Sequence, residues 1–382
     1  LDIFPNLRLN SDFNHTIYTR PVYKRPDSRY IYHLQEDTRN PIRYVYGVTL
    51  NDFHSMSAIG SQAWACGEHG IIYHTTNSGQ VWEAQTEGNS DSLNAIQFLD
   101  ADNGWTVGNV GTILQTTNGG SSWNNRSIVT FANLKNVHFL SGMHGAIVGN
   151  YGLIIRTTDG GQNWQSQTSG TQRTLNAIRY TNTNVGIAVG DSGLVLTTKD
   201  GGTTWQSVVS LITRHLYSLS FVDTYRAIIV GERGQVIRLN SVDNGNTWVA
   251  TQFNLGTASD MRSIQFFDNS NVWICGNNGV VFKSNNGGTT WATIPTSVTQ
   301  NLNGVSFVSA SQGWCAGSSG TLLITTNGGS SWQTQPRGNI NVGVIDGAKS
   351  FVFLGLPLHR LNGDGTVKDF LEHVLFEEFG LR

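Results

Sequence analysis

Apolar residues occur in short runs along most of the chain, and the same order of runs returns repeatedly. In the second unit an alternating stretch at 93–98 precedes apolar runs at 105–107 and 113–115, and Gly108 and Gly111 stand between these two runs. Runs this short predict β-strands, and the glycine pair predicts a tight hairpin that needs positive φ. No unit has room for a helix, so each predicts three or four strands.

A tryptophan closes each unit, and successive tryptophans are 41, 41, 41, 43, 43 and 41 residues apart. Units of this length cannot bury an apolar face alone, so they must stack, and seven of them predict a closed ring. We therefore predict an all-β, seven-bladed β-propeller that forms one toroidal domain at 47–340, where 382 residues would otherwise suggest two or three domains. The tryptophans are Trp82, Trp123, Trp164, Trp205, Trp248, Trp291 and Trp332.

The residues before each tryptophan form a motif that resembles the Asp-box, or BNR repeat. The best match is Ser241–Trp248, which fits S-x-D-x-G-x-T-W. Asp or Asn in such a turn bonds nearby backbone N–H groups, and glycine supplies positive φ. We interpret the tryptophans and the acidic positions Asp159, Asp200 and Asp243 as structural elements rather than as a reaction centre.

Both ends of the chain lie outside the repeat. Four prolines and mixed charges predict an extended arm at 1–46, and 341–382 is expected to form a strand and an amphipathic helix at Val367–Phe379. An open sheet edge invites aggregation, so we expect Ile42–Val48 or Val342–Ile345 to add a strand to a terminal blade and close the ring. The ends are either docking elements for a partner or segments that pack on the propeller.

Composition excludes several classes of protein. The net charge is −2 and charged residues make up 13%, which gives no basic field for nucleic acid. Three cysteines are too few for a disulfide scaffold, and we interpret them as apolar core residues. Histidine and cysteine at metal-ligand spacing are absent, so neither a metal nor a cofactor is expected. Low charge and many Asn, Ser and Thr residues indicate an extracytoplasmic protein: periplasmic, lumenal or at the cell surface.

The first apolar strand of each unit predicts polar positions that face the central channel. One position follows the leading apolar residue, which we take to be Leu50 in the first unit and Leu93 in the second, and another position comes three residues later. Hydrated scaffold is the favoured interpretation of both, and ligand contact is the alternative. The first position holds Asn51, Asn94, Lys135, Asn176, Tyr217, Arg262 and Asn303, and the second holds His54, Gln97, His138, Arg179, Ser220, Gln265 and Ser306.

Arginines accumulate in units three to six despite the nearly neutral total. Arginine suits carboxylate and phosphate contacts and is frequent at interfaces, so we predict a partner-binding patch. The alternative is a scattered set of solvated charges, offset by Asp159, Asp191, Asp200, Asp223 and Glu232. The predicted binding residues are Arg156, Arg173, Arg179, Arg214, Arg226, Arg233 and Arg262, together with Lys135 and Tyr217.

The region 50–335 resembles the photosystem II stability/assembly factor family of cyanobacteria and plastids. The resemblance rests on a repeated V-G-x-x-G…T-x-[DN]-G-G-x-x-W unit, seen at Val107–Trp123, Val148–Trp164 and Val189–Trp205. It implies a seven-bladed propeller without catalysis, which binds a protein partner through an arginine-rich surface during assembly of a membrane complex. The chain would then be an assembly factor or an accessory subunit.

Two other functions remain open. Asp-boxes also occur in glycoside hydrolases, for which Glu68, Asp52 and Asp191 are the candidate carboxylates, although Pro41–Tyr44 does not fit a sialidase arginine motif. A carbohydrate-binding or adhesive surface protein would stack sugars on exposed aromatics such as Tyr151 and Tyr217, but an aromatic anchor for a protein partner has the same signature.

Overall fold

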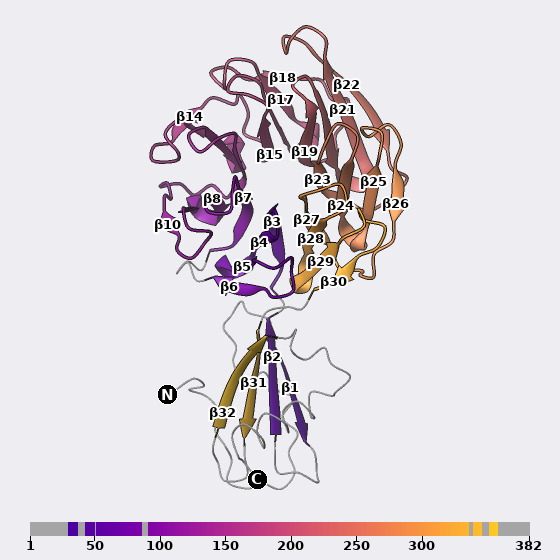
Figure 1. Ribbon diagram of the computed structural model, residues 1–382. Helices are drawn as coiled ribbons and strands as arrows, with labels where there is room; N and C mark the ends of the chain where they lie inside the picture. The colour runs from indigo at the N-terminus through magenta and orange to yellow at the C-terminus, as the bar shows by residue number, and fades with distance from the viewer. Residues whose placement is uncertain are drawn as a thin grey trace.

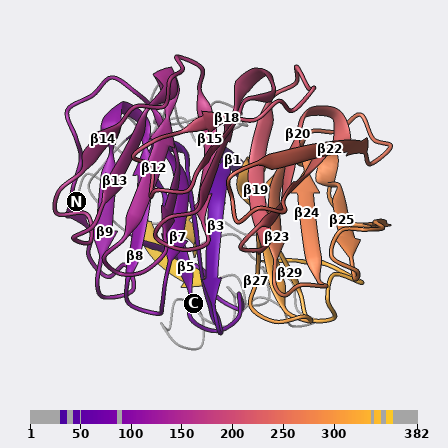
Figure 2. The same cartoon turned by 90° about the horizontal axis from the view of Figure 1, so that it is seen from above.

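The computed structural model describes residues 51–85 and 91–335, and the backbone of four further strands nearer the chain ends. Residues 53–334 build seven four-stranded antiparallel sheets arranged around a centre, as Figure 1 shows, and Figure 2 gives the view turned by 90°. The predicted seven-bladed all-β propeller is confirmed. The predicted domain limits 47–340 stay a prediction, and the predicted helix at Val367–Phe379 lies outside the described residues.

Each blade uses four strands that are consecutive in the sequence, from the innermost to the outermost. Blade 1 holds β3 (Phe53–Ile59), β4 (Gln62–Gly67), β5 (Ile72–Thr75) and β6 (Glu83–Gln85), and blade 2 holds β7 (Leu93–Phe98), β8 (Gly104–Gly108), β9 (Ile113–Thr116) and β10 (Asn124–Asn125). Blade 3 holds β11 (Leu134–Phe139), β12 (Gly145–Gly149), β13 (Ile154–Thr157) and β14 (Gln165–Gln167), and blade 4 holds β15 (Leu175–Tyr180), β16 (Gly186–Gly190), β17 (Val195–Thr198) and β18 (Gln206–Ser207).

The remaining three blades follow the same order. Blade 5 holds β19 (Leu216–Asp223), β20 (Arg226–Gly231), β21 (Gln235–Ser241) and β22 (Trp248–Asn254), and blade 6 holds β23 (Met261–Phe266), β24 (Val272–Gly276), β25 (Val281–Ser284) and β26 (Ala292–Ile294). Blade 7 holds β27 (Leu302–Phe307), β28 (Gly313–Gly317), β29 (Thr321–Thr325) and β30 (Gln333–Thr334). A one-turn 3-10 segment joins the second strand to the third in every blade: η1 (Glu68–Gly70), η2 (Asn109–Gly111), η3 (Asn150–Gly152), η4 (Asp191–Gly193), η5 (Glu232–Gly234), η6 (Asn277–Gly279) and η7 (Ser318–Gly320).

The two glycines that flank these turns have different physical roles. The second has positive φ, as predicted, with Gly111 at 73°. The first is extended, with Gly108 at −151°, and a Cβ there would lie 2.4 Å from the carbonyl oxygen of Ser92. The expectation of positive φ is therefore wrong for the first glycine, which is needed because the backbone of the inner strand approaches so closely.

Aromatic residues fill the junctions between blades. Phe139 at the end of β11 stacks on Trp105 of the preceding blade at 3.7 Å and meets Trp164 of its own blade edge-on at 6.0 Å. Phe307 lies in the same way between Trp273 and Trp332. Such pairs prefer these geometries and contribute about 0.5–1.5 kcal/mol each beyond the area they bury.

The three cysteines are buried, as expected of core residues. Cys275 and Cys315 occupy neighbouring strand positions in the repeat and so face opposite sides of their sheets. Both side chains therefore enter one core between blades 6 and 7. Burial raises the pKa of the Cys315 thiol, and the Cys275 thiol beside it adds to the shift.

The inner strand of each blade is a sheet edge, and side chains of the preceding blade satisfy its backbone N–H groups. Phe139 donates its N–H to Gln97 Oε1 at 2.7 Å, and Phe266 donates to Ser220 Oγ at 3.1 Å. These acceptors occupy the second of the predicted channel positions, so that position joins blades. Buried N–H groups left without a partner are costly, which gives the sequence a reason to keep an acceptor there.

The ring closes through the same interaction. Ala58 on β3 donates its N–H to Ser306 Oγ of blade 7 at 3.0 Å, and Asn303 Nδ2 donates to the carbonyl of Phe53 at 2.7 Å. The expectation that a terminal strand joins blade 1 or blade 7 is wrong, because both blades are complete from their own consecutive strands.

The terminal strands instead form an eighth sheet. Its order is β1-β2-β31-β32, from β1 (Tyr30–Glu36), β2 (Arg43–Thr49), β31 (Asn339–Ile345) and β32 (Phe351–Pro357). All neighbours are antiparallel, with Arg43 opposite Ile345 and Gly47 opposite Asn341. Part of the predicted extended arm thus forms the antiparallel pair β1 and β2. The pairing of β2 with β31 joins the segment before the propeller repeat to the segment after it.

Strand register also corrects the alignment of the first unit. Phe53 pairs with Gly67 as Leu93 pairs with Gly108, so Phe53 is the leading residue and Leu50 is not. His54 therefore belongs to the first channel position and Ser57 to the second. His54 Nδ1 lies 3.0 Å from the carbonyl oxygen of Leu93, a contact equivalent to the Asn303 bond.

We expect Ser306→Ala and the matched Ser220→Ala to destabilise the protein by a similar amount, about 1–3 kcal/mol each, because each leaves a backbone N–H without its acceptor. Equilibrium denaturation of both variants measures this. A loss for Ser220→Ala with none for Ser306→Ala would show that closure does not depend on this bond.

Stability should fall as the pH falls below about 6.5, partly because of His138. Burial lowers the pKa of His138 to about 3 from 6.5, with the Arg179 cation adding to the shift, and the neutral ring accepts the N–H of Tyr180. The unfolded chain therefore takes up a proton that the folded chain refuses, which costs about 2 kcal/mol between pH 7 and pH 5.

His138→Gln places the residue of the second unit at this position and should remove that part of the pH dependence. The measurement is the free energy of unfolding of both proteins at pH 7 and pH 5. An unchanged difference between the two pH values in the variant would contradict the assignment.

Candidate binding face

The propeller has two faces that differ in what they present. The seven η turns lie on one face, together with the loops that lead from each outer strand to the next inner strand. The proximity of Gly152 to Thr171, and of Gly193 to Ile212, shows this packing. The Asp-boxes lie on the opposite face, beside the hairpins of the inner strands, as with Gly119 and Ala101. We call these the turn face and the box face.

Most of the predicted binding residues lie on the turn face. Lys135, Tyr217 and Arg262 follow the leading residues of β11, β19 and β23. Arg233 is exposed in the middle of η5. The loops that precede β15 and β19 carry Arg173 and Arg214.

The structure places the other three arginines elsewhere. Arg226 lies on the box face, where its Nε is 2.6 Å from Asp223 Oδ2. Arg156 reaches from β13 to the carbonyls of Thr183 and Gly201 in blade 4. Arg179 lies in the inner strand of blade 4, where burial lowers its pKa to about 10.

Arg179 occupies the channel position that holds an acceptor in most of the other units. Arginine has no acceptor atom. Its Nη1 donates instead to Asn136 Oδ1 at 2.6 Å and to the carbonyl of Ile178 at 2.8 Å. The bond to Asn136 joins blades 3 and 4, and the guanidinium of Arg179 is thus hydrogen-bonded within the ring.

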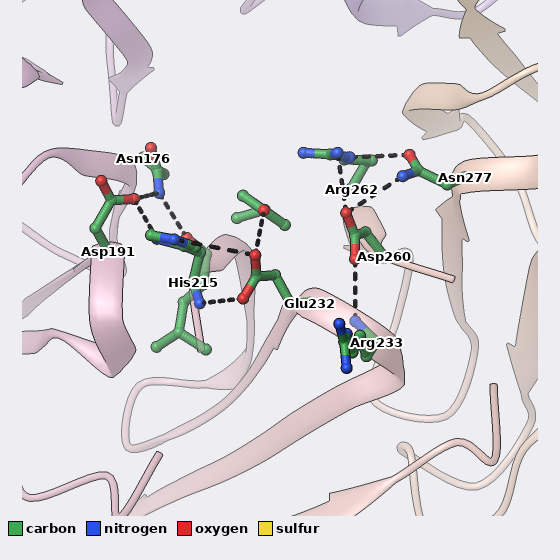
Figure 3. A network of polar contacts seen from close by, with 10 residues as sticks. Asn176, Asp191, His215, Glu232, Arg233, Asp260, Arg262 and Asn277 are labelled. Carbon is green, nitrogen blue, oxygen red and sulfur yellow. Dashed lines mark hydrogen bonds and ion pairs between the residues drawn. The ribbon is translucent and has the colours of Figure 1, made fainter. Parts of the chain in front are cut away.

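Asp260 organises one half of a polar network across blades 5 and 6, drawn in Figure 3. Its Oδ2 lies 3.1 Å from Arg262 Nη2 and accepts from Asn277 Nδ2 at 3.2 Å, while its Oδ1 accepts the backbone N–H of Arg233 at 3.1 Å. Arg262 also donates from Nε to Asn277 Oδ1 at 3.0 Å. The carboxylate thereby fixes Arg262 and the η5 turn that presents Arg233.

His215 is the centre of the other half of this network. Its Nδ1 is 2.9 Å from Asp191 Oδ1, and its Nε2 is 4.0 Å from Glu232 Oε1. Glu232 also accepts the backbone N–H of His215 and the Tyr217 hydroxyl. The two carboxylates lie in η4 and η5 and face the histidine from opposite sides in Figure 3.

Tyr217 connects the two halves. The Arg262 guanidinium lies 4.3 Å from the centre of its ring, a cation–π contact. Burial raises the pKa of Tyr217 to about 12, with Glu232 and Asp260 adding to the rise and Arg262 opposing it. The hydroxyl therefore stays protonated at neutral pH and donates to Glu232.

Four cations on the turn face keep their charged heads available. Among residues 51–85 and 91–335, no ion pair joins the side chain of Lys135, Arg173, Arg214 or Arg233 to a carboxylate. The neighbouring acids Asp191, Glu232 and Asp260 are each held by several contacts. This face therefore carries four cations without an ion-pair partner among the described residues, while Asp260 is paired with Arg262.

Several first-position side chains join blades rather than face a ligand. Asn94 Nδ2 donates to the carbonyl of Leu134 at 2.7 Å, and Asn176 Nδ2 donates to that of Leu216 at 2.9 Å. Lys135, Tyr217 and Arg262 replace this asparagine in blades 3, 5 and 6. The ring of equivalent positions thus separates the asparagines that join blades from three positions where another side chain replaces the asparagine.

The carboxylates considered for hydrolysis are not gathered in one place. Asp52 and Glu68 belong to blade 1, where Glu68 Oε2 accepts the N–H of Asp52 and Asp52 Oδ1 accepts the N–H of Ser319. Asp191 lies in blade 4, bound to Asn176 and His215. Within the described residues, no group of three or more His, Cys, Asp or Glu side chains could hold a metal ion.

A family model described as photosynthesis system II assembly factor YCF48 matches residues 82–167, 121–214 and 205–298, which together span more than half of the chain. The chain belongs to this family. No curated protein matches it in a sequence comparison. The family comprises assembly factors, consistent with the resemblance noted from the repeated units.

Similar solved structures agree on the fold. One, described as YCF48 bound to D1 peptide, is 23% identical, with a TM-score of 0.61 over 77% of this chain and 100% of that chain. YCF48 from Cyanidioschyzon merolae is 18% identical, with a TM-score of 0.61 over 73% and 96%. The WD40 propeller domain of Doa1 is 13% identical, with a TM-score of 0.57 over 72% and 92%.

The residues predicted from the sequence do not include His215, Asp260 or Asn277, and they include Glu232 only as an offsetting charge. Their shared signal is positional. Asp191, Glu232 and Asn277 all follow the first glycine of the turn, and His215 and Asp260 precede the leading residue of an inner strand. Comparing these two positions across the seven units would have found the network.

Proposed function

We propose that the chain is a non-catalytic assembly factor whose turn face binds an acidic or C-terminal peptide segment of a membrane-complex subunit. Membership of the YCF48 family supports the assembly role. A similar propeller is described as bound to a D1 peptide, which supports a peptide as the ligand. The main support for this peptide site is the set of cations without an ion-pair partner among the described residues: Lys135, Arg173, Arg214 and Arg233.

The physical argument is charge recognition on a fixed platform. Guanidinium groups bind carboxylates with two parallel hydrogen bonds, which gives direction as well as affinity. Asp260 fixes the η5 turn below Arg233 through the backbone N–H. The backbone that carries Arg233 is thus held in place before the ligand arrives, which lowers the entropy lost on binding.

The proposal includes an extracytoplasmic place of action. Support comes from the low charge and the many Asn, Ser and Thr residues. No helix among the described residues is long and apolar enough to cross a membrane. The partner would then present its peptide segment on the extracytoplasmic side of its membrane.

We expect the double substitution Arg214→Gln and Arg233→Gln to weaken binding of an acidic peptide with a free C-terminal carboxylate by at least about tenfold. It should also lower the salt dependence of binding, because fewer charges take part. Calorimetric titration at two salt concentrations measures both effects. The matched control Arg226→Gln removes an arginine on the box face and should leave binding unchanged.

The biological partner is tested by purification from the source under mild detergent, with mass spectrometry of the proteins that co-purify with the tagged chain. Recovery of a membrane-complex subunit with the original chain, and its loss with the double variant, is the expected result. A chain that co-purifies with no such subunit would contradict the assembly role. Equal peptide binding by all three proteins would contradict the cation site.

A further inference from the structure

Exposed apolar side chains gather on one part of the turn face, over blades 2 and 3. Val129 and Phe131 lie in the loop at 126–133, between β10 and β11, where Val129 is fully exposed and Phe131 is 94% exposed. Val110 in η2 and Tyr151 in η3 are also exposed. Large apolar side chains presented together in this way mark sites that meet another molecule.

Asn133 joins the three segments that carry these side chains. Its Oδ1 accepts the N–H of Val110 at 3.2 Å, and its carbonyl oxygen accepts the N–H of Asn150 at 3.1 Å. The loop also packs on η2 directly, because Gly111 donates its N–H to the carbonyl of Ala132 at 3.0 Å. The exposed side chains therefore form one surface, which we call the apolar patch: Val110, Val129, Phe131 and Tyr151.

The repeat itself does not require apolar side chains in the η turns. Val110 and Tyr151 occupy the middle of their turns, where the other five units place polar side chains. These are His69, Ser192, Arg233, Asn278 and Ser319. All seven residues have positive φ, a conformation that a β-branched residue such as valine adopts at a cost. Val110 has φ of 52° and is 54% exposed, so burial within the fold does not account for its apolar side chain.

Two cations flank the apolar patch on the same face. Lys135 follows the first residue of β11, and Arg173 lies in the loop before β15, which packs on η3. Neither side chain forms an ion pair among the described residues. Asp91 lies beside η2, where its Oδ2 accepts a hydrogen bond from Thr112 Oγ1 at 3.3 Å. The patch thus combines apolar side chains with unpaired positive charge at its border.

A lipid bilayer with anionic headgroups fits this combination of groups. Side chains that project from loops can enter fluid hydrocarbon, which needs no matching groove. Tyrosine is favoured at the boundary between hydrocarbon and headgroups, and lysine and arginine attract anionic headgroups there. A peptide partner would instead pair with free backbone groups, but Ile128 and Ala132 already donate their N–H groups within this region.

We propose that the apolar patch is a membrane-docking site, whose side chains enter the surface layer of an anionic lipid bilayer while Lys135 and Arg173 contact the headgroups. Val129 and Phe131, the most exposed members, enter deepest. This inference does not rest on the peptide site. It turns the face that carries Arg214 and Arg233 toward the membrane.

The test is flotation of the full chain with vesicles of phosphatidylcholine containing phosphatidylglycerol, beside vesicles of phosphatidylcholine alone. Val129→Ser combined with Phe131→Ser should lower partitioning into the anionic vesicles by at least about tenfold, because the transfer of a phenylalanine side chain out of water is lost. Thermal unfolding should not change, because neither side chain is buried in the fold. The matched control Val242→Ser changes a valine that is 94% exposed on the box face and should leave partitioning unchanged.

Two further variants test the charges and the turn separately. Lys135→Gln combined with Arg173→Gln should lower partitioning into the anionic vesicles by about fivefold for each charge and remove the preference for them over phosphatidylcholine. Val110→Asn takes the residue of the sixth unit at the same turn position. It should partition more weakly and melt at an equal or higher temperature, because asparagine tolerates positive φ.

A dye that responds to its surroundings measures insertion directly when it is attached to Phe131→Cys. The three cysteines of the chain are buried, so the introduced thiol is the one that reacts in the folded protein. Emission should shift to shorter wavelength on addition of anionic vesicles. The same dye on Val242→Cys should show no shift.

Equal partitioning of the original chain and the Val129→Ser, Phe131→Ser variant would overturn the proposal, as would binding to neither kind of vesicle. A dimer that the original chain forms in sedimentation and this variant does not would assign the patch to contact between two copies and contradict membrane docking. Weaker binding of an acidic peptide by the same variant would assign the patch to the peptide site, with the same consequence. Unchanged peptide affinity with reduced partitioning is the expected result and separates this inference from the proposed function.

Discussion

The backbone N–H groups on the inner edge of each blade need acceptors, and the rest of the propeller depends on how they are met. An inner strand pairs with its own blade on one side only. Serine, glutamine, asparagine and histidine side chains of the preceding blade serve the other side, as Gln97 does for Phe139. These polar side chains thus fix both the distance and the rotation between neighbouring blades, because hydrogen bonds tolerate little misalignment.

The same constraint explains ring closure and the variation of side chains on the turn face. Blade 7 meets blade 1 through Ser306 and Asn303, as each earlier blade meets the next, so no strand needs to be exchanged. The inner-strand hydrogen bonds and the aromatic pairs hold the junctions between blades, so side chains on the turn face contribute less to folding. Lys135, Tyr217 and Arg262 can then replace the joining asparagine without opening the ring, since the second position and the apolar core still hold those junctions.

The network around His215 and Asp260 shows how equivalent positions of the repeat diverge. Equivalent turn positions hold asparagine or serine in blades 2, 3, 6 and 7 and Glu68 in blade 1, but they hold Asp191 and Glu232 in the adjacent blades 4 and 5. Asp191 is bound by Asn176 and His215, and Glu232 by His215 and Tyr217, which holds both turns in fixed positions. Asp260 holds the backbone of Arg233, whose side chain forms no ion pair among the described residues.

The sequence by itself determined the number of blades and the strand content, because the period and the glycine and tryptophan positions are local and recur seven times. It misplaced the first unit by three residues, because Leu50 and Phe53 both offer an apolar start and only strand register distinguishes them. It grouped Arg156, Arg179 and Arg226 with the turn-face cations, because a residue number does not show which face a side chain reaches. Ring closure and the contacts of Asp191 and Asp260 with the next or preceding blade were decided by tertiary structure alone, since each depends on residues of different blades meeting in space.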